Sequence, residues 1–190
     1  MTAFAIVILM TELTFFAAFL GTAISVIFLT SLAWKEHHPD NPRSFSTLVA
    51  QRRELVNQFR MASAVVSTLF TISIFFFIVP KVQYGTVLFV VWLVCYIAEL
   101  LVSIFPERGT IEKQLHSIFA YIMALCMLLT TVVFLLSFDG GVRMIQAGIL
   151  ICALILAVLA HIDKKRFIVY ELLFIYMSHA SILVAMFALK

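Results

Sequence analysis

The chain alternates long apolar stretches with short polar breaks, and this pattern predicts a series of membrane-spanning helices. A spanning helix needs about 20 mostly apolar residues. Six stretches reach that length, at about residues 13–34, 61–80, 84–105, 117–138, 142–162 and 167–189. Most breaks between them are only a few residues long, which forces neighbouring helices to run antiparallel. The pattern therefore predicts an all-α, polytopic integral membrane protein, built as a six-helix up-down bundle in one domain.

The long polar segment between the first two stretches predicts one further element. Two prolines, Pro39 and Pro42, exclude a continuous helix at its start. From about residue 46 to residue 60 the apolar residues fall on one helical face, which predicts an amphipathic helix lying on the membrane surface. The arginines that accompany it are candidate contacts for lipid headgroups: Arg43, Arg52, Arg53 and Arg60. The alternative is a solvated connector whose arginines only follow the charge bias of cytoplasmic loops.

Composition supports a membrane protein and predicts its orientation. Hydrophobic residues make up 64% of the chain and charged residues 12%, whereas about a quarter of a soluble domain is charged. If the N-terminus is outside, ten of the 13 Lys and Arg residues fall in inner connections and three in outer ones. Short cytoplasmic loops are enriched in these residues, so we predict that both termini are non-cytoplasmic. The three cysteines lie in apolar stretches and predict no disulfide framework.

Ionisable side chains within the apolar stretches are the candidates for chemistry, because each costs roughly 2.5–3.5 kcal/mol to insert. At helical rise, Glu99 lies about 9 Å and Glu171 about 6 Å inside the inner ends of their helices. His116 and His161 mark the inner ends of two other helices, so these four groups converge on one leaflet. We predict a polar pocket there, with Glu99 pointing into the bundle. Its candidate residues are Glu99, His116, Glu171, His161, Tyr96 and Ser103.

The chemistry of this set has several interpretations. Asp163 falls in the same leaflet, and His179 alone lies near the midplane. A mixed histidine and carboxylate set could hold Zn²⁺ or a harder divalent metal, or act as acid and base on a lipid headgroup. Alternatively the histidines are interfacial and the glutamates pair with Lys or Arg, with Arg108 and Lys113 as partners of Glu99. No catalytic motif selects one chemistry, so we predict no particular metal or cofactor.

The stretch from Glu99 through Phe105-Pro106 to His116-Ser-Ile-Phe119-Ala120 resembles a known family. It is similar to the third and fourth helices of the six-helix membrane family that includes the damage-regulated autophagy modulators and their uncharacterised bacterial relatives. The resemblance covers about a quarter of the chain. It implies a non-enzymatic or uncharacterised role in membrane lipid organisation, with no catalytic residues to transfer. The Arg-rich first loop departs from the family, in which this loop usually faces away from the cytoplasm.

These observations favour a non-enzymatic membrane protein that binds lipid or acts as an accessory, partner-binding subunit. The expected partners are membrane lipid, another membrane protein or a second copy of the chain, and not nucleic acid. An intramembrane enzyme acting on a lipid headgroup is the alternative. A small proton-coupled transporter using Glu99, Glu171 and His179 is less favoured, because no apolar stretch is interrupted by Gly and Pro and the two halves share no similarity.

Overall fold

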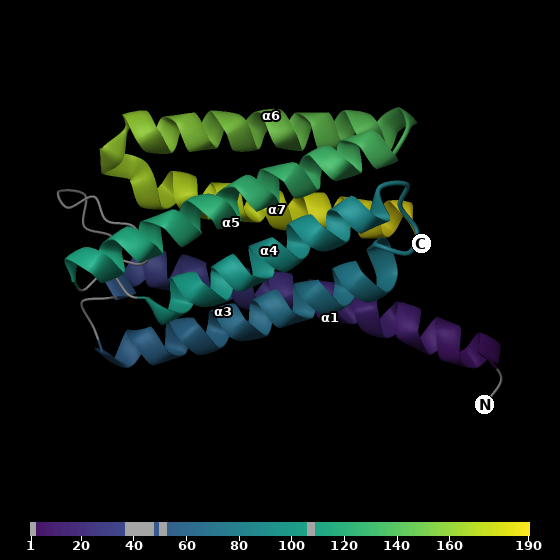
Figure 1. Ribbon diagram of the computed structural model, residues 1–190, viewed down its shortest axis with the longest axis horizontal. Coiled ribbons are helices and arrows are strands. Elements are labelled where there is room, and N and C mark those ends of the chain that lie inside the picture. The colour runs from purple at the N-terminus through teal and green to yellow at the C-terminus, as the bar shows by residue number, and fades with distance from the viewer. Residues whose placement is uncertain (1–2, 37–47, 50–52, 106–108) are drawn as a thin grey trace.

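The computed structural model describes residues 3–36, 48–49, 53–105 and 109–190, which form an all-α bundle (Figure 1). Its helices are α1 Ala3–Glu36, α3 Arg53–Ser73, α4 Gly85–Ile104, α5 Thr110–Ser137, α6 Gly140–Ile162 and α7 Phe167–Ala188. A π-helical turn at Ile74–Ile78 extends α3, and a 3₁₀ turn at Lys164–Arg166 precedes α7. Six segments of the described chain are long and apolar enough to cross a membrane. The predicted six-helix fold is confirmed.

Successive helices run antiparallel, and both termini lie at one end of the bundle (Figure 1). We call this end the terminal end; it also carries the connections 79–84 and 138–139. The opposite end, called the basic end, carries the connections 37–52, 105–109 and 163–166, which are rich in Lys and Arg. The first turns of α1 extend beyond the other helices (Figure 1).

Five helices surround the interior, and α6 lies outside them. α1, α3, α4, α5 and α7 each pack against their two neighbours in that order, and α7 closes the ring against α1. α6 packs on α5 and α7 from outside (Figure 1). Hydroxyl groups join neighbouring helices within the ring: Ser73 donates to the Thr14 carbonyl at 2.8 Å, and the Trp92 indole donates to Thr71 at 3.0 Å. Such interhelical hydrogen bonds are common in membrane bundles, where apolar burial does not distinguish a neighbouring helix from lipid.

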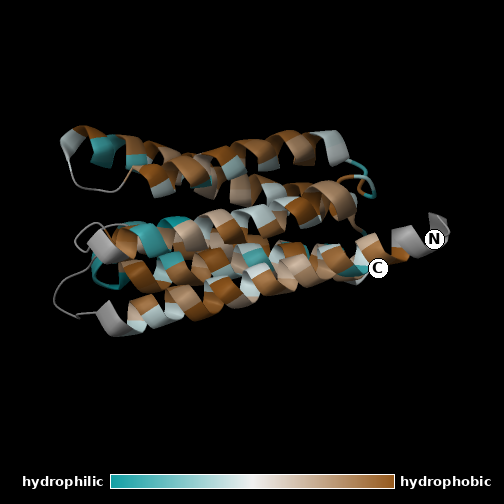
Figure 2. Cartoon of the chain, turned by 90° about the horizontal axis from the view of Figure 1, so that it is seen from below, coloured by the Kyte–Doolittle hydropathy of each residue, from teal (hydrophilic) through white to brown (hydrophobic). Residues whose placement is uncertain are grey.

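The outside of the bundle is apolar along most of its length. Ile27 and Met61 are 71% exposed and Met144 is 76% exposed. Figure 2 shows hydrophobic residues over the length of the helices and hydrophilic residues mostly near the two ends. A soluble monomer does not expose so much contiguous apolar surface. With its six candidate spans, the chain is a multi-pass integral membrane protein.

The half of the bundle nearest the terminal end is close-packed. Phe70, Ile74, Leu88, Phe134 and Met186 are at most 2% exposed. The turn between α3 and α4 is equally tight, because a Cβ at Gly85 would clash with the carbonyl oxygen of Val79. Glycine is therefore required there, and the bundle is held together most firmly in this half.

A buried polar pair fixes α6 to α7. The Gln146 amide donates to the Ser181 carbonyl at 2.9 Å, and the Ser181 hydroxyl donates back to the Gln146 side-chain oxygen at 2.7 Å. Both residues are at most 1% exposed. Water does not reach the Gln146 amide or the Ser181 hydroxyl, so rotating α6 about its axis would leave both groups buried without a hydrogen-bond partner.

The predicted interfacial helix at about residues 46–60 is described only in part, and Arg43 and Arg52 lie outside the described residues. Leu48 and Val49 are buried in an apolar cluster with Leu29, Leu32, Val56 and Ile168. Residues 53–60 continue directly into the second span as part of α3. The apolar face of this segment thus packs on α1 and α7 of the bundle itself. That the segment lies on a membrane surface stays a prediction.

Candidate functional site

A cavity of about 100 Å³ lies within the ring of five helices. Its wall combines apolar residues with buried and partly buried polar groups that come from all five helices. The polar members are Ser25, Ser63, Glu99, His116, Glu171, Ser178 and His179. Two carboxyls and two imidazoles lining one partly enclosed space make this cavity the strongest candidate site in the described chain.

The cavity occupies the half of the bundle nearest the basic end and reaches toward its middle. Glu99 lies five residues from the end of α4 at Ile104, or about 8 Å along the axis at helical rise. Trp92 and His179 each lie 12 residues from the basic end of their helices, or about 18 Å. The polar wall therefore extends from just inside the membrane boundary to near the middle of the spans.

Glu99 reaches the cavity because the inward face of α4 recurs at helical spacing through Trp92, Cys95, Glu99 and Val102. The Ser67 hydroxyl of α3 lies within hydrogen-bonding reach of the Glu99 carboxyl. Among the described residues Glu99 forms no ion pair. Lys113 is exposed and Arg108 lies outside the described residues.

His116 enters the wall from the first turns of α5 and closes the end of α4. Its Nδ1 lies 2.8 Å from the Phe105 carbonyl oxygen and 3.2 Å from that of Val102. Carbonyl oxygens only accept hydrogen bonds, so Nδ1 carries a proton and donates. In the neutral ring the lone pair is then on Nε2. His116 is thereby held in one orientation, with 4% of its surface exposed.

Arg60 completes the closure of α4 from the other side. Its Nε donates to the Ser103 carbonyl at 2.9 Å, and its Nη2 donates to the Ile104 carbonyl at 2.8 Å. The last carbonyls of a helix have no partner within the helix, and cationic groups are favourable there. Arg60 was predicted to contact lipid headgroups, but these two N–H groups form hydrogen bonds within the protein. The side chain of Arg53, the first residue of α3, is not described.

His179 lines the cavity on α7, although it is absent from the predicted pocket set. Its ring stacks on Phe70, with centroids 4.5 Å apart, and it is 5% exposed. Its Nδ1 has no hydrogen-bond partner among the described residues. The sequence places His179 beside the face that carries Glu171 and Ser178, and this adjacency was the signal for including it.

A groove of about 280 Å³ runs beside the cavity between α5, α6 and α7. It shares His116, Ala120, Met123, Glu171 and Ile175 with the cavity wall. The rest of its lining is largely apolar, with polar groups toward the basic end: Ser117, Tyr121, His161, Lys164 and Tyr170. Cavity and groove therefore meet at His116 and Glu171.

Three predicted pocket residues lie outside the cavity wall. His161 lines the groove. The Tyr96 hydroxyl lies 3.4 Å from the Thr68 hydroxyl, outside the cavity lining. The Ser103 hydroxyl donates to the Leu100 carbonyl of its own helix at 2.7 Å. The structure thus brings together Glu99, His116 and Glu171 in the cavity wall and places His161 with His116 and Glu171 in the groove lining. Tyr96 and Ser103 line neither space.

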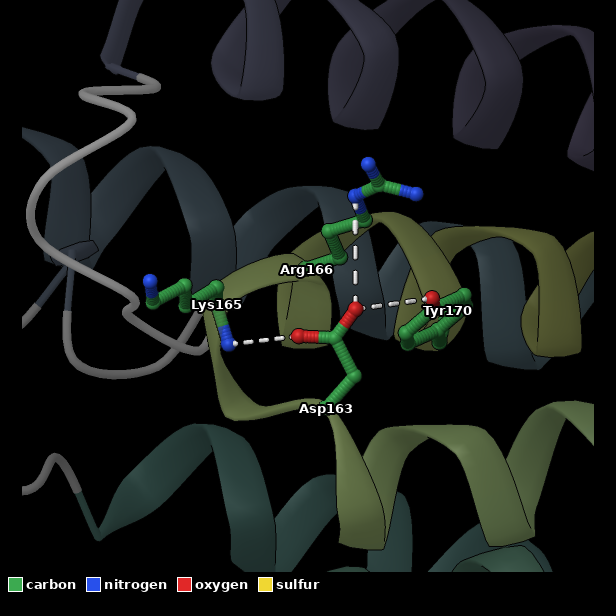
Figure 3. Close-up of polar contacts among 4 residues, drawn as sticks. All are labelled: Asp163, Lys165, Arg166 and Tyr170. Atoms are coloured by element: carbon green, nitrogen blue, oxygen red, sulfur yellow. Dashed lines mark hydrogen bonds and ion pairs between the residues drawn. The ribbon is translucent and has the colours of Figure 1, made fainter.

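Asp163 has a local role in the turn between α6 and α7. Its carboxylate accepts hydrogen bonds from the Lys165 backbone N–H and from the Tyr170 hydroxyl, both at 3.1 Å (Figure 3). Arg166 Nε lies 4.0 Å from the same carboxylate. This residue therefore shapes the turn and does not contribute to the cavity wall.

No group of three or more His, Cys, Asp and Glu side chains within the described ranges is arranged to hold a metal ion. The groups that line the cavity offer hydrogen bonds and charges in a partly enclosed, partly aromatic space. Comparisons of the chain with protein-family models, with curated proteins and with solved structures find no match.

Proposed function

We propose that this protein is a non-enzymatic lipid-binding membrane protein. In this proposal the polar headgroup enters the central cavity and an acyl chain lies in the groove between α5, α6 and α7. The observation that carries it is the shared wall of the two spaces: His116 and Glu171 lie where cavity and groove meet, and the surface of both spaces is mostly apolar. Ionisable groups set in a mostly apolar space match the two parts of a lipid.

Size and position support the same ligand. A cavity of about 100 Å³ is smaller than the roughly 150 Å³ engineered cavity that holds benzene. It has room for a small headgroup and not for a sugar. The groove lies along membrane-spanning helices and includes the exposed Tyr121, so an acyl chain could enter it from the bilayer.

The proposed orientation places the basic end at the cytoplasmic face, because this end carries most of the Lys and Arg residues. Both termini are then non-cytoplasmic and the cavity opens toward the inner leaflet. A cysteine introduced at the exposed Lys165 should resist labelling from outside intact cells. Labelling from outside would reverse the orientation. Membership in the family that residues 99–120 resemble is likewise proposed, and its implied role in lipid organisation agrees with lipid binding.

The test of the proposal is whether the protein retains lipid at this site. Protein purified in mild detergent should carry about one lipid per chain in native mass spectrometry. Ala160→Trp, which fills the groove, should remove that lipid. Leu154→Trp is the matched control, because Leu154 is exposed on the same helix and lines neither space. Purified protein without bound lipid, or equal retention by both variants, would overturn the proposal.

The alternative of an intramembrane enzyme has one observation in its favour. His116 is held by two backbone carbonyls beside two carboxyls, as a general base would be. The same lipid retention experiment addresses it, because an enzyme should convert the bound lipid with time. A bound lipid of unchanged mass after prolonged incubation supports the binding protein.

A further inference from the structure

The described cavity wall combines two carboxyls with two imidazoles and several aromatic rings. Phe28, Phe59, Phe70 and Trp92 contribute to it together with Glu99 and Glu171. None of the described residues in this wall is Lys or Arg. Arg60, the nearest arginine along α3, binds the end of α4 instead. An anionic group in this space would therefore face the Glu99 carboxyl, with no Lys or Arg among the described wall residues to balance the two charges.

Hydrogen-bond acceptors are available along the same wall. Glu99 presents a carboxyl that has no ion pair among the described residues. His179 is only 5% exposed, and its Nδ1 is a second polar atom that has no partner in the described chain. A buried polar atom without a partner costs roughly 1–3 kcal/mol. In the tautomer with the proton on Nε2, Nδ1 is an acceptor, and a ligand that donates a hydrogen bond to it would recover that cost.

A protonated amine suits this wall, because it is a cation and it donates hydrogen bonds. It donates hydrogen bonds to a carboxylate, and such charge-assisted bonds are stronger than neutral ones. Aromatic faces also attract an ammonium group, most strongly in places from which water is excluded. A phosphate or a carboxylate would form neither the hydrogen bond to the carboxylate nor the contact of an ammonium group with the aromatic faces.

We infer that the central cavity binds the protonated primary amine of a lipid headgroup, with Glu99 as its counter-ion. This inference rests on the proposed lipid-binding function and specifies its ligand class. The amine passes between His116 and Glu171, where cavity and groove meet, and the acyl chain follows the apolar part of the groove. Lys164 and His161, toward the basic end of the groove, are placed to contact the phosphate of such a headgroup.

The first test varies the lipid and leaves the protein unchanged. Full-length protein is placed in nanodiscs of neutral matrix lipid, and bound lipid is measured by native mass spectrometry. Four lipids with matched acyl chains are titrated in turn: phosphatidylethanolamine, its N-acetyl derivative, phosphatidylglycerol and phosphatidylcholine. We expect phosphatidylethanolamine to bind at least about tenfold more tightly than the other three, which lack an ammonium N–H. Equal binding of any of them would overturn the amine inference while leaving lipid binding intact. Binding of none would overturn the proposed function as well.

The second test varies the residue. Glu99→Gln keeps the shape of the side chain and removes its charge, so the preference for phosphatidylethanolamine should fall to within about twofold of the N-acetyl lipid. Glu112→Gln is the matched control, because Glu112 is exposed at the same end of the bundle, and it should keep the full preference. His179→Phe should weaken binding by about threefold, since it retains the ring beside Phe70 and removes the acceptor. A Glu99→Gln protein that keeps the tenfold preference would overturn the assignment of Glu99.

A free amine offers the same ammonium group as the lipid. A third test therefore asks whether the bound amine belongs to a lipid or to a small soluble molecule. Ethanolamine added at the concentration of the bound lipid should leave phosphatidylethanolamine in place, because it gains nothing from the groove. Displacement at that concentration would overturn the lipid as the ligand.

Discussion

The two halves of the bundle are built differently. Nearest the terminal end, aromatic and branched side chains fill the space between helices, and Phe15 packs edge to face on Phe77 at 5.1 Å. Nearest the basic end, the same ring of helices surrounds a cavity whose wall carries two carboxyls and two imidazoles, and a groove opens beside it. The large apolar side chains that are fully buried all lie on the terminal side of the spans: Phe70, Phe134, Ile74, Ile78, Leu88, Ile182 and Met186. Two of them, Phe70 and Ile182, also line the cavity where it reaches the middle of the bundle.

This difference suggests that the packed terminal half stabilises the fold and that the basic half provides the binding site. Dense packing contributes dispersion energy only where atoms touch, so an enclosed space is a region where the bundle forgoes stability. The basic half compensates at its edge, where Arg60 and His116 together satisfy four successive carbonyls at the end of α4. We expect stability to depend mainly on the terminal half and ligand binding on the basic half.

The largest expected effect is a loss of packing in the terminal half. Phe134→Ala removes a fully buried ring and should lower the free energy of unfolding by about 3–5 kcal/mol. Phe59→Ala removes a partly buried ring from the cavity wall and should cost less than half as much. Both can be measured by titration with denaturing detergent in mixed micelles. Equal costs would show that the two halves are equally packed.

The next effect concerns the closure of α4. Arg60→Gln removes two charge-assisted hydrogen bonds to the Ser103 and Ile104 carbonyls and should cost about 2 kcal/mol. Arg143→Gln is the counterpart at the terminal end, where Arg143 is exposed and binds Phe138 and Asp139. It should cost less than about 1 kcal/mol. The same titration compares the two, and an equal cost would mean that Arg60 does not compensate for the cavity.

Filling the cavity should sharpen the separation of roles. Ala120 lines both the cavity and the groove, and Ala120→Leu places extra methyl groups in that space. Unfolding should change by less than about 1 kcal/mol, because the added atoms occupy a void. Lipid retention should fall at least about tenfold, which corresponds to 1.4 kcal/mol of binding free energy. Ala23→Leu, on an exposed position of α1, should leave both quantities unchanged.

The smallest effect is expected from an exposed ion pair. Lys190 Nζ lies 3.3 Å from the Glu12 carboxylate, with roughly half of each side chain exposed. Lys190→Gln should therefore lower stability by less than about 1 kcal/mol in the same assay. A larger loss would indicate that the terminal half depends on charge as well as packing.

The sequence predicts the helices well because each apolar stretch is long and bounded by polar breaks. The predicted second span begins at residue 61, whereas α3 begins at Arg53. The amphipathic pattern of residues 53–60 resembles that of a surface helix, yet the apolar face packs on neighbouring helices. Periodicity identifies an apolar face and does not identify what covers it.

The candidate site was predictable in part. Glu99 and His116 lie near a common helix connection, so their proximity follows from topology alone. Tyr96 and Ser103 share the helical period of Glu99, but their hydroxyls lie 3.4 Å from Thr68 and 2.7 Å from the Leu100 carbonyl. His179 depends on how α7 is rotated against α3, which no spacing within α7 determines.

The polar pair Gln146–Ser181, which joins α6 to α7, bears on how this sequence can diverge. Most of α6 faces outward, so many of its residues can be exchanged for other apolar residues of any shape without disturbing a neighbour. Gln146 is different, because a change there leaves the Ser181 hydroxyl buried and unsatisfied. Homologous chains should therefore drift freely along the outer face of α6, while positions 146 and 181 change only together.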